Sequence, residues 1–235
     1  PGDAVEMAAA WKLAIESKEN PTALILTRQN VETMAGSSVE GVSKGAYIIG
    51  KEEKQCDAII IASGSEVNLA MNAKTELLKK GIDVRVVSMP CQEIFDQQDK
   101  AYKQSVLPND VRKRLSVEMA SSFGWHKYVG LDGIVMSIDE FGRSAPASQV
   151  IESFGFTVDK VVENVEKSDY IAPNPDVETD IAENTQYNEG DTVKVTATAK
   201  ANNGGNIAKV EFYNGDKLVG TSTEAPYTCE YKGLT

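Results

Sequence analysis

Histidine is almost absent from this sequence, because His126 is the only one among 235 residues. Sites built from several histidines, such as many catalytic zinc centres, are therefore excluded. The three cysteines, Cys56, Cys91 and Cys229, are an odd number, and their spacing fits neither a metal cluster nor a disulfide framework. We predict small hydrophobic roles for them in a reducing, cytoplasmic compartment, and no metal site in this chain.

Long apolar runs and an excess of positive charge are also missing. No stretch approaches the roughly 20 consecutive apolar residues that a membrane-spanning helix needs. The formal net charge is -11, and its field repels polyphosphates and anionic lipids. We therefore expect no nucleic-acid partner and no membrane association. Because the sequence starts at Pro1 rather than at a methionine and a helical pattern follows at once, we also expect it to be part of a longer chain.

Up to about residue 168, short apolar runs rich in β-branched residues alternate with helical patterns. This alternation is typical of an α/β fold with a mostly parallel sheet flanked by helices. Helices are predicted after Ser65, where apolar residues recur at helical spacing as far as residue 80, and twice after Pro146. The predicted strands are 58–62, 84–88, 114–118 and 133–136, with 45–49 as an edge strand.

The first thirty residues do not obviously belong to this sheet. Residues 5–15 have an amphipathic helical pattern, and residues 21–27 have the composition of a buried strand. We interpret residues 1–30 as the end of a preceding domain and residues 31–168 as the α/β domain.

The composition changes after residue 168. Prolines and asparagines predict a linker over residues 169–179, followed by a small all-β sandwich segment over residues 180–235. Residues 192–199 and 208–213 alternate with the period of two that strands require. Two groups rich in Asn and Gly, 202–206 and 214–216, predict hairpin turns.

Two places in the α/β part could bind a ligand. Ser63, Gly64, Ser65 and Glu66 follow a predicted strand and precede a helix, which is where open α/β sheets bind ligands. The alternative for these four residues is an ordinary helix cap. Arg28 follows the strand at 21–27, and its guanidinium could bind a phosphate with two hydrogen bonds, although it could also be a surface arginine.

Two further titratable residues admit a catalytic and a structural interpretation. Glu118 ends an apolar strand and could act as a general acid or base with a raised pKa, but a hydrogen-bonded carboxylate at the sheet rim is the more common case. His126 lies beside Trp125 and Tyr128, so we favour a packed residue of an aromatic cluster over a catalyst.

Several segments, in order along the chain, resemble the transketolase family. The resemblance covers about residues 1–168, and the matching segments are Pro21–Asn30, Ala62–Val67, Val86–Pro90, Tyr102–Pro108, Phe141–Ala147 and Phe154–Thr157. It implies an enzyme that transfers a two-carbon ketol unit between sugar phosphates with thiamine diphosphate and magnesium, and that acts as a homodimer. It also implies that residues 1–30 close the pyrimidine-binding domain and that residues 31–168 form the carboxy-terminal domain.

The family's metal-binding motif and its catalytic glutamate and histidines lie upstream of the segment that this chain resembles. The resemblance therefore implies no catalytic residue here, no cofactor binding by this chain and no activity of the chain alone. Arg28 matches the family arginine that contacts the phosphate of the acceptor sugar. The other roles that the resemblance implies for the α/β domain are packing, subunit contact and binding of a regulatory ligand.

Residues from about 176 to 235 resemble the bacterial immunoglobulin-like modules that are appended to secreted glycoside hydrolases and surface proteins. The resemblance rests on Val210–Gly220 and Ala225–Tyr227, and we expect the module to be incomplete. A natural appendage, a fusion and a composite sequence all stay open as its origin.

Two alternatives to a transketolase part remain at this point. One is a non-catalytic binding or docking module whose immunoglobulin-like segment contacts a carbohydrate or another surface. The other is a relative among the synthases and dehydrogenases that share this domain, which the segment Thr27–Asn30 disfavours.

Overall fold

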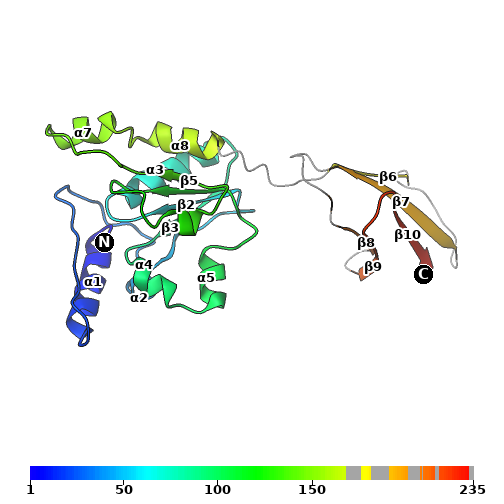
Figure 1. Cartoon of the computed structure of the whole chain (residues 1–235), viewed down its shortest axis with the longest axis horizontal. Helices are drawn as coiled ribbons and strands as arrows, with labels where there is room; N and C mark the ends of the chain where they lie inside the picture. Colours follow the sequence, from blue (N-terminus) through cyan, green and yellow to red (C-terminus); the bar gives the residue numbers. More distant parts are fainter. Residues whose placement is uncertain (168–175, 181–190, 201–206, 208, 215–216, 233–235) are drawn as a thin grey trace. The chain divides into compact units, whose positions relative to one another are not determined.

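The chain forms two compact units, Pro1–Tyr170 and Ile171–Thr235 (Figure 1). The structure is a computed structural model, and it describes residues 1–167, 176–180, 191–200, 207, 209–214 and 217–232. Most of the predicted linker lies outside these residues. Its last residues, Asp176–Thr179, pair with a neighbouring strand and form β6. The predicted domain limits themselves stay a prediction.

A five-stranded sheet forms the centre of the first unit, in the order β1-β3-β2-β4-β5. Strand β2 pairs in parallel with β3 and β4, β4 pairs in parallel with β5, and only β1 is antiparallel. The predicted α/β fold and its edge strand are thereby confirmed. The strands are β1 (Tyr47–Gly50), β2 (Ala58–Ala62), β3 (Val84–Ser88), β4 (Arg114–Val117) and β5 (Ile134–Met136).

Helices cover both faces of this sheet (Figure 1). Ala58, Ile60 and Ala62 of β2 face a core that α3 and α8 complete, whereas Ile59 and Ile61 face a second core. Helices α4, α5 and α6 contribute to that second core. The helices are α1 (Ala4–Glu16), α2 (Val39–Ser43), α3 (Glu66–Lys79), α4 (Gln92–Asp96), α5 (Lys100–Val106), α6 (His126–Val129), α7 (Ala147–Ser153) and α8 (Val158–Lys167).

The strand predicted over residues 21–27 does not form. These residues have no regular structure, and Ile25 is 83% exposed. Strand composition alone does not make a strand, because its backbone groups need a partner strand, and no described strand pairs with this segment. Helix α1 forms as predicted, but its Trp11 and Ile15 are also exposed. Large apolar side chains of both N-terminal segments therefore face outward.

Two buried carboxylates tie α1 to the rest of the first unit. Glu6 is fully buried and accepts hydrogen bonds from the backbone N–H of Gly2 (2.6 Å), from the Tyr47 hydroxyl (2.8 Å) and from the Ser88 hydroxyl (2.5 Å). Burial, together with the negative charge of Glu6, raises the pKa of Tyr47. Asp3 caps α1 and also accepts a hydrogen bond from the backbone N–H of Met34 (2.9 Å). The first helix is thereby tied to the sheet by polar contacts.

The second unit consists of antiparallel strands, which fits the small β-sandwich predicted from the sequence. One sheet has the order β10-β7-β6, and β8 pairs with β9 in a second sheet. A small core contains Ala197, Phe212, Tyr227 and Cys229. The predicted strand 192–199 is confirmed as part of β7, and 208–213 overlaps β8, whereas residues 202–206 and 215–216 of the predicted turns lie outside the described residues. The remaining strands are β7 (Thr192–Lys200), β8 (Val210–Asn214), β9 (Lys217–Ser222) and β10 (Tyr227–Lys232).

For two fully buried serines of the first sheet, we predict that replacement by alanine changes stability in opposite directions. The hydroxyl of Ser116 has no hydrogen-bond partner, whereas that of Ser88 donates to Glu6. We expect Ser116→Ala to raise the free energy of unfolding by about 1 kcal/mol and Ser88→Ala to lower it by about 2 kcal/mol, because the second change leaves a buried carboxylate short of a donor. Urea unfolding followed by tryptophan fluorescence measures both, since Trp11 and Trp125 lie in the first unit. Destabilisation of similar size by both changes would contradict the prediction.

Candidate ligand site at the carboxyl edge of the sheet

The parallel pairing of β2 with β3 and β4 brings three chain turns to one edge of the sheet. Ala62, the last residue of β2, pairs with Ser88 of β3 and with Val117 of β4. The residues that follow each strand therefore leave the sheet together. The turn after β2 is Ser63–Ser65, and Gly64 in it has a φ of +56°, a left-handed conformation that favours glycine.

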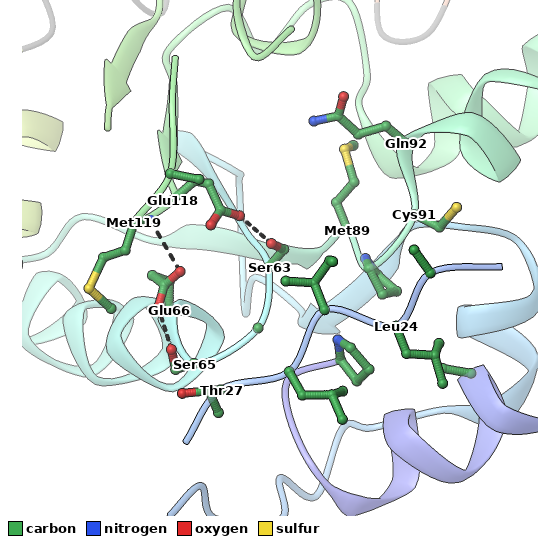
Figure 2. A pocket seen from close by; sticks show the side chains of 18 of the residues that line it. Leu24, Thr27, Ser63, Ser65, Glu66, Met89, Cys91, Gln92, Glu118 and Met119 are labelled. Carbon is green, nitrogen blue, oxygen red and sulfur yellow. Dashed lines mark hydrogen bonds between the residues drawn. The ribbon is translucent and has the colours of Figure 1, made fainter. Parts of the chain in front are cut away.

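A cleft of about 760 Å³ lies at this edge (Figure 2). Ser63, Gly64, Ser65 and Glu66, the possible ligand site considered from the sequence, all line it, and Glu118 lines it as well. Sequence reasoning missed other parts of the lining, among them residues 89–94 after β3, residues 119–121 after β4, Phe123 and Trp125, and the irregular segment 22–27. Residues 89–94 and 119–121 each follow directly after a predicted strand, and this position was the signal that could have found them.

The side chain of Ser65 does not cap α3, which is a correction to the helix-cap interpretation of this turn. Its backbone is already helical, with φ and ψ of -61° and -22°, and it makes no side-chain capping hydrogen bond. Its hydroxyl donates instead to Glu66 Oε1 at 2.5 Å.

Hydrogen bonds connect Glu66 and Glu118 to the turn after β2 and to the segment after β4, which both line the cleft (Figure 2). The Ser63 hydroxyl donates to Glu118 Oε2, and the backbone N–H of Met119 donates to Glu66 Oε2 at 3.2 Å. Glu66 is only 4% exposed, and Glu118 is half-buried. The turn after β2 and the segment after β4 are therefore joined through the two carboxyl groups, named here the Glu66–Glu118 pair.

Both carboxyl groups of the Glu66–Glu118 pair bind their protons more tightly than an exposed glutamate does. Burial is the main cause that raises the pKa of Glu66, and the neighbouring charge of Glu118 raises it further. Burial also raises the pKa of Glu118, against the opposing effect of the Ser63 hydrogen bond. The raised pKa that we considered for Glu118 from the sequence is therefore present, but its first cause is burial at the sheet rim.

The polar groups of the cleft favour a neutral or cationic ligand over an anion. Among the described residues, no lysine, arginine or histidine lines the cleft. A buried protonated carboxyl group can donate a hydrogen bond to a ligand, and the serine hydroxyls can donate or accept.

Arg28 lies outside this cleft. Its side chain is exposed, while Thr27 and Gln29 on either side of it line the cleft. The backbone N–H of Gln29 donates to the Thr27 hydroxyl at 3.2 Å, which shapes the turn that presents Arg28. The structure therefore does not bring Arg28 together with the residues of the Glu66–Glu118 pair.

His126 is not a packed residue of an aromatic cluster, which corrects the interpretation that we favoured from the sequence. The cluster is formed by Phe95, Tyr102, Trp125 and Tyr128. His126 is exposed, because the short turn of α6 directs Trp125 and Tyr128 inward and residue 126 outward.

Neither a metal centre nor a membrane span occurs within the described part of the chain. No three His, Cys, Asp or Glu side chains there come together in a group that could hold a metal ion. The helices found in those same residues are too short or too polar to cross a membrane.

The fold is an α/β domain with helices on both faces of its sheet and a cleft at the carboxyl edge of its parallel strands. Residues 45–157 match the family model of the transketolase-like C-terminal domain, and residues 179–234 match that of the bacterial Ig domain. The chain thus contains a transketolase-like C-terminal domain and a bacterial immunoglobulin-like domain, as the sequence resemblance implied.

Individual relatives agree with this assignment. The transketolase of Bacillus subtilis is 54% identical over 169 residues, which are 70% of this chain and 25% of that protein. A probable transketolase of Streptococcus pneumoniae is 53% identical over 165 residues, again 70% of this chain and 25% of the relative.

Solved structures show the same similarity. A Pichia stipitis transketolase in complex with sedoheptulose-7-phosphate matches 72% of this chain and 24% of its own, with a TM-score of 0.68 and 44% identity. Transketolase from Leishmania mexicana matches 72% of this chain and 25% of its own, with a TM-score of 0.66 and 44% identity. The chain therefore spans about a quarter of the length of these relatives.

The raised pKa of Glu66 predicts how stability changes with pH. Because the folded protein binds the Glu66 proton more tightly than the unfolded chain does, this proton stabilises the folded state. The stabilisation is fully present below the ordinary glutamate pKa of about 4.3, and it is lost as the pH rises through the raised pKa of Glu66 in the folded state. Glu66→Gln carries no titrating proton, so we expect its stability relative to the unchanged protein to increase by about 1 kcal/mol or more between pH 5 and pH 8.5. Urea unfolding at the two pH values measures this difference.

Glu76→Gln is the matched control for this prediction, because Glu76 lies on the same helix with its side chain 47% exposed. Its stability relative to the unchanged protein should vary little over the same pH interval. If Glu66→Gln behaves like Glu76→Gln, the account of the buried proton is wrong.

Proposed function

We propose that this chain is the carboxy-terminal part of a transketolase that transfers a two-carbon ketol unit between sugar phosphates. The observation that carries the proposal is the 54% identity to the Bacillus subtilis enzyme, which extends over 169 residues of one continuous region. Solved relatives are described in complex with sedoheptulose-7-phosphate and fructose-6-phosphate, which supports sugar phosphates as the substrate class.

In this proposal, thiamine diphosphate and magnesium belong to the complete enzyme, whose pyrimidine-binding and diphosphate-binding parts lie upstream of the aligned region. Residues 1–168 supply no catalytic group of their own, and the chain alone is inactive. The proposed setting is a cytoplasmic enzyme of the pentose phosphate pathway. The cleft at Ser63–Glu66 then takes a regulatory ligand rather than the substrate.

Exposed apolar side chains support a homodimer or an upstream domain as a partner of the first unit. Phe123, Leu131 and Phe141 are at least 90% exposed, and Trp11 and Ile25 are also largely exposed. Isolated apolar residues are common on protein surfaces, but several large ones on one unit are typical of surfaces that another part of an assembly covers. We propose that the rest of the complete enzyme covers them.

Arg28 is the residue of this chain that we propose contacts the substrate, through the phosphate of the acceptor sugar. The test uses a chimera in which residues 1–168 replace the aligned part of Bacillus subtilis transketolase. We expect Arg28→Ala in this chimera to raise KM for a phosphorylated aldose about ten- to a hundredfold, because a charge-assisted, two-pronged contact stabilises by roughly 1.5 to 3 kcal/mol. Steady-state kinetics with the phosphorylated aldose and with the same sugar lacking its phosphate measure the effect.

Two variants serve as controls for Arg28→Ala. Arg28→Lys retains the positive charge but cannot form two parallel hydrogen bonds to the phosphate. Its KM for the phosphorylated aldose should therefore lie between that of the unchanged chimera and that of Arg28→Ala. Lys12→Ala removes a cation whose side chain is 64% exposed on α1, and it should leave KM unchanged. Equal losses on the phosphorylated and unphosphorylated sugars would rule out a phosphate contact by Arg28.

A further inference from the structure

The order of the strands creates a topological switch point at the cleft. Strand β2 continues through α3 into β3, which lies on one side of β2 in the sheet. Strand β4 lies on the other side of β2 and continues through α6 into β5, so the two connections leave the sheet in opposite directions. Open α/β sheets bind their ligands outside the carboxyl ends of the strands at such a point. The turn after β2 and the segment after β4 are therefore the expected walls of a ligand site.

Hydroxyl groups dominate the polar lining of this cleft. The Ser63 hydroxyl donates to Glu118 and the Ser121 hydroxyl donates to Asp139, and each hydroxyl oxygen keeps lone pairs that can accept a hydrogen bond from a ligand. Gln92 adds an amide that both donates and accepts, and its side chain has no hydrogen-bond partner within the described part of the chain. The hydroxyl-bearing residues of the lining are Thr22, Thr27, Ser63, Ser65 and Ser121.

The charged groups of the lining select against an anionic ligand. The carboxyl groups of Glu66, Glu93 and Glu118 line the cleft, and no described lysine, arginine or histidine accompanies them. A phosphate would lose its hydration there without gaining a cation. Both oxygens of the buried Glu66 already accept hydrogen bonds, one from the Ser65 hydroxyl and one from the Met119 N–H. Glu66 therefore offers little to an incoming cation, and the hydroxyl and amide groups are the main partners for a ligand.

The size of the cleft and its apolar surface suit a small molecule. Its volume of about 760 Å³ lies within the roughly 300 to 1,000 Å³ that is typical of small-molecule sites. Met89 and Trp125 line it together with the hydroxyl groups, so polar and apolar surface lie in one cleft. A polyhydroxylated molecule matches this combination, because its hydroxyl groups bind the polar side chains while its C–H groups pack on the apolar ones.

We propose that the cleft at the carboxyl edge of the sheet binds an uncharged polyhydroxylated ligand of about monosaccharide size and discriminates against the phosphorylated form of the same molecule. Hydroxyl groups of the ligand donate to Glu118 and exchange hydrogen bonds with Ser63 and Gln92. The inference deepens the proposed function, which assigns this cleft to a regulatory ligand, and it separates that ligand from the phosphorylated substrates by charge. Its test measures binding alone, so a failure there leaves the proposed ketol transfer untouched.

Trp125 reports binding, because it lines the cleft and the full chain with Trp11→Phe has no other tryptophan. The neutral probes are D-glucose, D-ribose and ribitol, each compared with its monophosphate, and glucosamine is the cationic probe. Titrations follow the fluorescence of Trp125, and saturation-transfer NMR detects the bound probe independently. We expect a dissociation constant on the order of 1 to 10 mM for at least one neutral probe, and at least tenfold weaker binding of its monophosphate.

Two variants test whether the probe binds in this cleft. Ser63→Ala and Gln92→Ala each remove one hydrogen-bonding group of the lining, so each should weaken binding of the neutral probe about two- to tenfold. Gln92→Ala breaks no hydrogen bond within the described residues, so it decides if circular dichroism shows that Ser63→Ala has not folded. Glu76→Gln changes an exposed carboxylate of α3 that does not line the cleft, and it should bind the probe unchanged.

The proposal is overturned if none of the three neutral probes binds saturably at concentrations up to about 100 mM. It is also overturned if a monophosphate binds as tightly as its neutral form, or if glucosamine binds at least tenfold more tightly than every neutral probe, because the cleft would then select for charge. Binding that a folded Gln92→Ala variant retains in full would place the probe outside the proposed site.

Discussion

The burial of strand β2 between two parallel neighbours is the constraint on which the first unit depends. Each of its residues from Ala58 to Ala62 is at most 1% exposed, with alternate side chains in two different cores. A parallel strand cannot connect to its neighbour by a tight turn, so the chain must cross a face of the sheet and return. The turns after β2, β3 and β4 consequently gather at one edge, and the cleft between them follows from that topology rather than from any special motif.

Polar contacts within this frame determine what the domain can do. Hydrogen bonds to Glu6 join α1 to β1 and β3, and Asp3 binds the backbone N–H of Met34. The N-terminal segment also lies against the turn that lines the cleft. The Glu66–Glu118 pair also accepts hydrogen bonds, and through them it joins the turn after β2 to the segment after β4. The exposed apolar side chains of the same unit suit a domain that works inside the larger assembly we propose.

The features that could be predicted from the sequence are those that depend on the local pattern of residues. Residues 58–62 and 84–88 formed the expected strands, since their composition requires burial on both faces, and Ser63 to Glu66 reached the expected sheet edge. The strand predicted over 21–27 was wrong because a strand depends on a partner that composition does not reveal. The outward direction of His126 depends on one short helical turn, and the pairing of Glu66 with Glu118 depends on two distant segments meeting, so neither could be inferred from spacing.

The most direct test of the account is the ketol-transfer activity of the chimera that joins residues 1–168 to the upstream part of Bacillus subtilis transketolase. The account predicts kcat/KM within about tenfold of the parent enzyme, because the aligned region would supply the same packing surface and the same Arg28 contact. Residues 1–168 alone, assayed in parallel with thiamine diphosphate and magnesium, should give no turnover. A folded chimera that binds the cofactor but transfers no ketol unit would contradict the account, as would turnover by the isolated residues 1–168.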